Sequence, residues 1–139
     1  MSKLASIRAN RTRMKKEFDA QSKIGRHGKT GLARIALTPE YNRVRDLVRS
    51  WMESAGLATR VDAVGNLFGR KEGGVKGLPA VMAGSHLDSQ NPGGRFDGPA
   101  GVLTALEAVR RIAEVGVPHD HPLEVVAFVG EESACGIVT

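Results

Sequence analysis

The sequence predicts an α/β fold in which helices pack on a sheet. Residues 123–129 form a continuous apolar run rich in β-branched side chains, typical of a strand buried on both faces, as in a parallel sheet. Residues 98–115 repeat apolar side chains at helical spacing. The 139 residues are 41% hydrophobic and include 17 glycines but only 4% aromatics, which favours one domain with tight turns over a base-stacking platform.

The first predicted element is a basic helix over residues 8–24, ending near Gly25, so that a leading basic helix occupies residues 1–25. Residues 1–29 hold nine basic and two acidic side chains, a net charge of +7, whereas the rest of the chain sums to −2. Such a helix can contact nucleic acid or an acidic membrane. Four apolar side chains also give it a side that can dock on the protein, and we favour this solvated, docked helix: Leu4, Ile7, Met14 and Phe18.

A second helix is predicted after the loop of residues 25–37. Thr38 can cap it, Pro39 suits its first position, and Glu40 lies at the positive end of its dipole. Apolar residues then recur at helical spacing until Gly56, the expected end. Residues 57–64 and 67–70 predict a hairpin around a two-residue glycine turn.

The remaining elements form a βαβ unit in residues 78–132. Leu78 to Ser85 predicts a short buried strand, residues 98–115 a helix that Gly116 ends, and residues 123–129 the next strand. The two strands lead into His86 and into Glu131 and Glu132. Because ligands of open α/β sheets bind at the carboxyl ends of strands, both polar groups are expected at one sheet edge.

The first polar group combines an imidazole with two carboxylates. His86 and Asp88 are two residues apart and face the same side of an extended backbone, so one can ligate a metal while the other supports it. Asp97 precedes the helix at residue 98, where free N–H groups favour a negative charge, and a carboxylate there can bridge two cations.

The second polar group is Glu131 and Glu132. Adjacent residues of an extended chain point in opposite directions, so one carboxylate can bind metal while the other faces the reacting water. A metal-bound water and a free Glu form a general-base arrangement for hydrolysis. His119 and His121 are interpreted as surface residues, and Cys135, the single cysteine, as an unreactive thiol.

The single cysteine also excludes an internal disulfide, and no segment reaches the length of an apolar membrane span. The N-terminus has no apolar core of a secretory signal. We therefore expect a cytoplasmic protein without nucleic-acid or membrane partners.

Three runs together resemble the zinc-dependent amidohydrolases of the N-carbamoyl-L-amino-acid hydrolase and allantoate amidohydrolase family, relatives of the di-zinc aminoacylases and aminopeptidases. These runs are Gly-Ser-His-Leu-Asp-Ser at 84–89, Gly-Gly-Arg-Phe-Asp-Gly at 93–98 and Glu-Glu-Ser at 131–133. The resemblance covers nearly the whole chain and also includes residues 32–38, 61–70 and 101–107. It implies the N-terminal half of a di-zinc catalytic domain, without the lid and dimerisation domain.

The resemblance assigns a role to each matching residue. His86 would bind the first metal, Asp97 would bridge two metals, and Glu132 would bind the second. Glu131 would be the general base, and Asp88 would orient or polarise His86. The implied reaction is attack of a metal-bridging hydroxide on the ureido or amide carbon of an N-carbamoyl-L-amino acid or a ureido acid such as allantoate.

The chain departs from the family after Glu132, where the family has a small residue pair followed by Arg-Phe-Gly but Ser133-Ala134-Cys135-Gly136 lacks the Arg-Phe. Family members are also roughly three times longer. We therefore expect an incomplete two-metal site, an inactive chain when alone, and a homodimeric parent. Zinc is the expected metal, with manganese, cobalt or nickel as alternatives. The rival functions are an aminoacylase or peptidase of the same group and a non-catalytic basic binding module.

Overall fold

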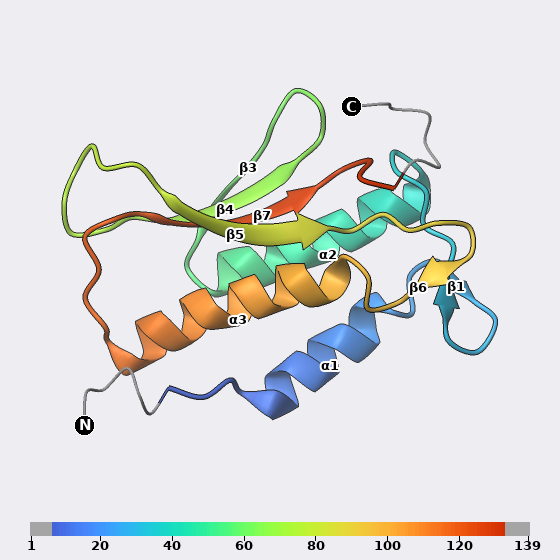
Figure 1. Ribbon diagram of the computed structural model, residues 1–139, viewed down its shortest axis with the longest axis horizontal. Helices are drawn as coiled ribbons and strands as arrows, with labels where there is room; N and C mark the ends of the chain where they lie inside the picture. Colours follow the sequence, from blue (N-terminus) through green and yellow to red (C-terminus); the bar gives the residue numbers. More distant parts are fainter. Residues whose placement is uncertain (1–6, 133–139) are drawn as a thin grey trace.

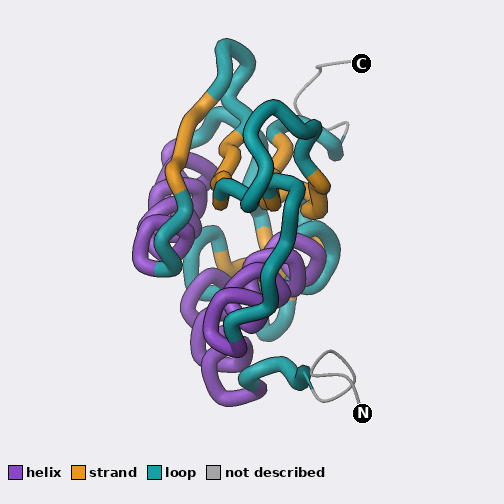
Figure 2. Tube along the Cα trace, turned by 90° about the vertical axis from the view of Figure 1, so that its left-hand side faces the viewer, coloured by secondary structure: helices purple, strands orange, loops and turns teal. Residues whose placement is uncertain are grey.

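The computed structural model describes residues 7–132. One mixed sheet is covered on one face by two helices, and a third helix lies outside them (Figures 1 and 2). In chain order the elements are α1 (Arg11–Gln21), β1 (Arg26–His27), β2 (Gly31–Leu32), α2 (Pro39–Ser54), β3 (Ala58–Val61), β4 (Leu67–Lys71), β5 (Val81–His86), β6 (Gly93–Gly94), α3 (Pro99–Val115) and β7 (Leu123–Phe128).

The main sheet has the strand order β3-β4-β7-β5. β5 and β7 pair in parallel, with His86 opposite Phe128, and α3 connects them, so the three elements form a βαβ unit. β7 pairs with β4 in the antiparallel sense, which makes the sheet mixed rather than parallel. The short strands β1, β2 and β6 form a separate small sheet beside the carboxyl end of β5 (Figure 1).

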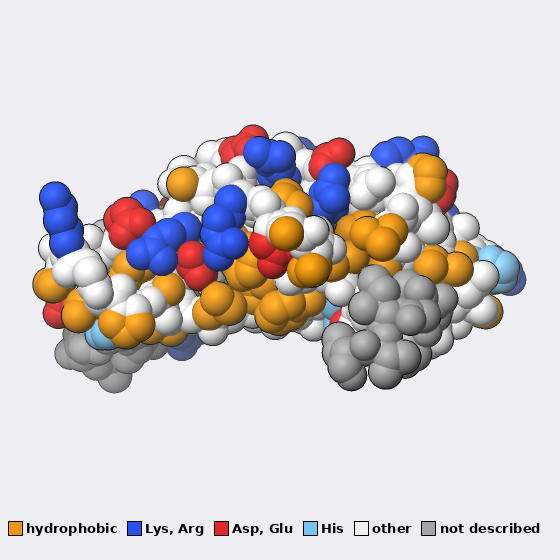
Figure 3. Space-filling view, turned by 90° about the horizontal axis from the view of Figure 1, so that it is seen from above, with side chains coloured by type: hydrophobic (Ala, Val, Ile, Leu, Met, Phe, Trp, Pro, Cys, Tyr) orange, Lys and Arg blue, Asp and Glu red, His pale blue; other side chains and the backbone are white. Residues whose placement is uncertain are grey.

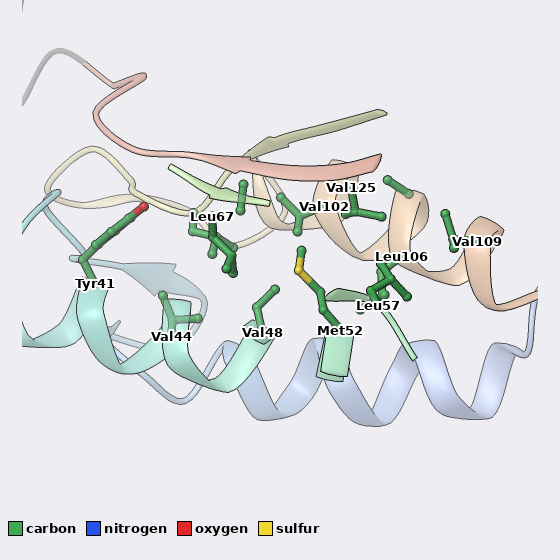
Figure 4. Packing of buried hydrophobic residues seen from close by; sticks show 13 residues of the cluster. Tyr41, Val44, Val48, Met52, Leu57, Leu67, Val102, Leu106, Val109 and Val125 are labelled. Carbon is green, nitrogen blue, oxygen red and sulfur yellow. The ribbon is translucent and has the colours of Figure 1, made fainter. Parts of the chain in front are cut away.

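The core lies between the main sheet and the pair α2 and α3. α3 packs on β5 and β7, α2 packs on β3 and β4, and α1 packs against α3 and α2. Apolar residues from α2, α3 and the main sheet are fully buried there, as Figure 4 shows: Tyr41, Val44, Val48, Met52, Leu67, Val102, Leu106 and Val125. Each such side chain contributes about 1.5–3 kcal/mol to folding relative to an exposed position.

The helix boundaries follow the expected capping signals. Thr38 accepts a hydrogen bond from the Tyr41 N–H at the start of α2, and Pro39 occupies its first turn. α3 begins after Gly98 and ends at Gly116, whose left-handed backbone closes the helix. α1 is shorter than predicted, because Asn10 caps its start and its C-terminal cap is Ser22. None of the helices in residues 7–132 has the length and apolar composition that crossing a membrane requires.

Three expectations about strands are wrong. β5 was expected to be buried, but it lies at the sheet edge, and Val81 and Met82 are exposed. The β3–β4 turn spans residues 62–66 instead of two residues, because Asp62 accepts hydrogen bonds from the N–H groups of Val64, Gly65 and Asn66. Residues 25–37 are not all loop, since β1 and β2 pair there and β2 pairs with β6.

Candidate metal centre

His86 ends β5 and is buried. Its Nδ1 lies 3.0 Å from the main-chain carbonyl oxygen of Asp88. Because a carbonyl only accepts hydrogen bonds, this contact places the ring proton on Nδ1 and leaves the lone pair of Nε2 available. A neutral imidazole held in this way presents Nε2 as a metal ligand.

Gly98 allows the start of α3 to approach the His86 ring. Its φ of +81° is a conformation that residues with a Cβ rarely adopt. A Cβ at this position would lie 2.6 Å from His86 Cε1, His86 Nδ1 and the His86 carbonyl oxygen. Asp97 therefore arrives directly beside the imidazole, with Oδ1 3.6 Å from His86 Nε2 and 71% of its side chain exposed.

The acidic pair follows β7. Gly130 has a φ of +75°, and the chain bends there instead of continuing as a strand. Glu131 Oε2 lies 3.6 Å from His86 Nε2, and one ligand atom from each of His86, Glu131 and Glu132 lies within 4.8 Å of the others. The expectation that the two adjacent carboxylates point in opposite directions is therefore wrong, because the bend at Gly130 lets both reach the same site.

Asp88 connects the two halves of the site. Its side chain is 1% exposed, and its carboxylate accepts hydrogen bonds from the N–H groups of Gly130 and Glu132, at 3.2 and 2.9 Å. The same carboxylate has Oδ1 3.8 Å from His86 Nδ1, so the hydrogen-bond partner of the ring is the Asp88 carbonyl. Asp88 thus holds the acidic loop with its side chain and the imidazole with its main chain.

Sequence reasoning missed two residues of this region. The Gln90 amide donates a 2.5 Å hydrogen bond to Glu132 Oε2. Arg34 is fully buried below the same loop and exchanges hydrogen bonds with Ser89. Neither residue has a metal-ligand spacing in the sequence, so only the folded chain reveals their proximity. The available signals were the polar Gln90 two residues after Asp88 and the position of Arg34 within the run of residues 32–38 that resembles the family.

The other sequence candidates lie elsewhere. His121 Nδ1 contacts the carbonyl oxygen of Pro79, and His119 Nδ1 contacts the carbonyl oxygen of His121, which agrees with their interpretation as surface-loop residues. His27 is exposed on β1. Cys135 lies outside the described residues.

The geometry fits a divalent ion. The two carboxylate oxygens at 3.6 Å from His86 Nε2 are too far away for good hydrogen bonds. A tetrahedral ion with bonds of about 2.0–2.2 Å separates its ligand atoms by roughly 3.3–3.6 Å. One imidazole nitrogen and several carboxylate oxygens form a donor set that zinc, manganese, cobalt and nickel accept. The described residues thus include a group that can hold a metal.

Comparison with known proteins identifies the class to which this fold and site belong. The model of peptidase family M28 matches residues 66–136, which include both strands of the βαβ unit and the acidic pair. The chain belongs to this family.

The particular relatives are amidohydrolases. The chain is 50% identical over 111 residues to the N-carbamoyl-L-amino acid amidohydrolase of Geobacillus stearothermophilus, covering 80% of this chain and 27% of that protein. It is 41% identical over 103 residues to allantoate deiminase 1 of Glycine max, covering 73% of this chain and 21% of that one. The resemblance to this family is thereby confirmed, and the chain spans less than a third of the length of these relatives.

A solved structure agrees with the sequence matches. A hydantoinase/carbamoylase family amidase from Burkholderia ambifaria superposes with a TM-score of 0.89 at 42% identity. The match covers 92% of this chain and 31% of that one. The predicted α/β fold of a hydrolase catalytic domain is confirmed.

Proposed function

We propose that this chain is part of a protein that hydrolyses a linear C–N bond in an N-carbamoyl-L-amino acid or a related ureido acid such as allantoate, and that the 139-residue chain alone is inactive. The observation that carries this proposal is the cluster around His86, where Asp97 Oδ1 lies 3.6 Å from His86 Nε2 and both Glu131 and Glu132 bring a carboxylate oxygen to the same imidazole. The names of the relatives, N-carbamoyl-L-amino acid amidohydrolase and allantoate deiminase, support the choice of substrate class.

In this proposal His86, Asp97 and Glu132 hold divalent metal, with zinc as the first choice. Bound metal would acidify a water and polarise the scissile carbonyl or ureido group. Glu131 would take a proton from the attacking water and return it to the leaving nitrogen, and its 59% exposed side chain beside His86 supports this role. The Asp88 carboxylate accepts a hydrogen bond from the Glu132 N–H and so holds residues 130–132 close to His86.

Two matched variants separate the proposed roles of the adjacent glutamates. In the whole protein that contains this chain, we expect Glu131→Gln to lower kcat on an N-carbamoyl-L-amino acid by about 10²–10⁴-fold while zinc is retained, because only the base is lost. Glu132→Gln should instead weaken zinc binding. Zinc affinity is measured by competition with a chromophoric chelator, and kcat by amino-acid release.

His119→Ala serves as the control, since this residue lies in a surface loop away from His86, and it should change neither quantity. Loss of zinc from Glu131→Gln with retention in Glu132→Gln would reverse the two assignments. Equal activity before and after removal of metal with a chelator would reject the metal-dependent mechanism.

A second candidate function is peptidase or aminoacylase activity, which the name of peptidase family M28 favours. The residues around His86 would do the same work on an amide bond, so the catalytic centre does not separate the two functions. Comparing kcat/KM for carbamoyl, acyl and dipeptide derivatives of one amino acid tests the choice. A dipeptide or acyl preference would replace the proposed substrate class.

A further inference from the structure

Arg34 is the largest fully buried side chain in residues 7–132, with no surface exposed to solvent. It lies between β2 and α2, and no carboxylate of the described residues forms an ion pair with it within 4.0 Å. Its Nε has no hydrogen-bond partner in this part of the chain. Burial lowers the pKa of the guanidinium to about 10, and the charge of Asp88 partly opposes this shift. Burial of a cation without an ion-pair partner costs free energy of folding, so other contacts of the guanidinium must offset this cost.

The guanidinium binds the C-terminal end of α1. Nη1 donates to the carbonyl oxygens of Gln21 and Ile24, at 3.2 and 3.5 Å, and Nη2 donates to Gln21 Oε1 at 2.9 Å. Carbonyls at the end of a helix lack partners within the helix and favour positive charge. These contacts fix the guanidinium relative to α1.

The main chain of Arg34 binds the metal loop, which we define as residues 86–97. The Arg34 N–H donates to Ser89 Oγ, and the Ser89 N–H donates to the Arg34 carbonyl oxygen, both at 3.0 Å. At the other end of the loop, Gln21 Nε2 donates a long 3.5 Å hydrogen bond to the Arg95 carbonyl oxygen. Arg34 and its partner Gln21 therefore contact the loop near Asp88 and near Asp97.

We propose that Arg34 is a positioning residue that sets the spacing between the two ends of the metal loop, and so between His86 and Asp97. The reason lies in the chain of contacts. Arg34 holds Ser89, the neighbouring Asp88 carboxylate holds the N–H groups of Gly130 and Glu132, and Gln21 supports Arg95. The positive charge of Arg34 also offsets the buried carboxylate of Asp88. Only the consequence for metal affinity rests on the proposed function.

Arg110 offers a matched control. It is also a buried arginine, which binds Glu17 of α1 and the carbonyl oxygen of Trp51 of α2. It lies on α3, and among residues 7–132 no hydrogen bond or ion pair joins its side chain to the metal loop. Arg34→Met and Arg110→Met each replace a buried arginine with the same uncharged side chain, so each removes one buried guanidinium. A purely structural role would give the two variants the same effects.

The first measurement is amide hydrogen exchange in the metal-free protein. We expect Arg34→Met to speed exchange in peptides from residues 86–97 and 130–132 by roughly tenfold, and Arg110→Met to leave these peptides within about twofold of the native protein. Arg34→Lys, which keeps the charge but loses the planar fork, should give a smaller increase. If Arg34→Met does not fold, Arg34→Lys replaces it in the comparison with Arg110→Met.

The second measurement is zinc affinity, which we expect Arg34→Met to weaken by about tenfold or more and Arg110→Met to leave unchanged. Unchanged exchange in the metal loop, or the same increase in both variants, would overturn the proposal. If the native protein bound no zinc, the proposed function would fail, while the exchange comparison would still decide the role of Arg34.

Discussion

At the scale of single residues, the site depends on a close contact between Gly98 and His86 that only a glycine can make. Gly98 lets α3 begin against the His86 ring, and the three atoms nearest to a Cβ at this position all belong to His86. The position of the imidazole is thus determined from both sides, by the Asp88 carbonyl at Nδ1 and by the Gly98 backbone at the ring.

We expect Gly98→Ala to lower both stability and metal affinity. The positive φ and the 2.6 Å contacts should together reduce the free energy of unfolding by about 2–4 kcal/mol. Because the clash displaces His86, zinc affinity should fall as well. Chemical denaturation and chelator competition measure the two effects.

Gly116→Ala is the control for backbone strain alone. Gly116 also has a positive φ, +68°, but a Cβ there would meet nothing within 4 Å. We expect this variant to lose about 1 kcal/mol of stability and no zinc affinity. Equal zinc affinity in Gly98→Ala and Gly116→Ala would show that the close approach to His86 has no role in metal binding.

At the scale of elements, α1 is fixed to α3 by ion pairs and to the metal loop by a contact between aromatic rings. Arg13 of α1 binds Glu107, which is buried on α3, and also binds Glu114. Phe18 stacks on Phe96 with ring centroids 4.5 Å apart. Part of the basic charge of the leading helix therefore serves its packing on the protein, which supports the docked-helix interpretation.

The Arg13–Glu114 contact predicts a dependence of stability on acid pH. Hydrogen bonds from Arg13 and Arg111 lower the pKa of Glu114 to about 2, below its ordinary value of 4.5. Its contribution is therefore complete above about pH 4.5 and is lost as the pH falls toward 2. Since Glu114 is largely exposed, this contribution is small.

We expect Glu114→Gln to be less stable than the native protein at pH 7 and to approach it at pH 2.5, as thermal unfolding at both pH values would show. Glu40→Gln, which removes a pair within one helix turn, is the control. A constant stability difference between native and Glu114→Gln proteins across this pH range would contradict the assignment.

At the scale of the whole molecule, the sheet is covered on one face only. Phe128 follows the buried Ala127 on β7 and so lies on the face turned away from α2 and α3, where it is 41% exposed. Met82 lies on the same face, because it pairs with Glu124, which alternates with the buried core residue Val125, and it is 48% exposed. Figure 3 looks onto this side, where apolar side chains lie among arginines and acids. The candidate site at the end of the sheet is similarly open, with Asp97 and Glu131 largely exposed.

We predict that the purified 139-residue chain, loaded with zinc, gives no steady turnover of N-carbamoyl-L-amino acids. The three proposed ligands supply fewer donors than two metal ions need, and the open site does not exclude water. Amino-acid release over many turnovers is the measurement. Sustained release that Glu131→Gln abolishes would contradict this prediction.

Much of the fold could be predicted because its signals are local. Thr38 with Pro39 starts α2, Gly116 ends α3, and the apolar run of residues 123–129 is the central strand β7. One of the errors concerns position in the sheet. The apolar pattern of residues 78–85 indicates a strand but cannot show that β5 forms an edge, because an edge is defined by neighbours distant in sequence.

The sequence by itself determined the family and the set of chemical groups, because the runs around His86, Asp97 and Glu131 are contiguous and specific. Only the tertiary structure decided how those groups meet. The bend at Gly130 turns both glutamates to the same site, and Arg34 becomes a neighbour of Ser89, 55 residues away along the chain. The physical reason is that ligand spacing depends on buried hydrogen bonds and backbone turns between distant segments, which leave no periodic pattern in the sequence.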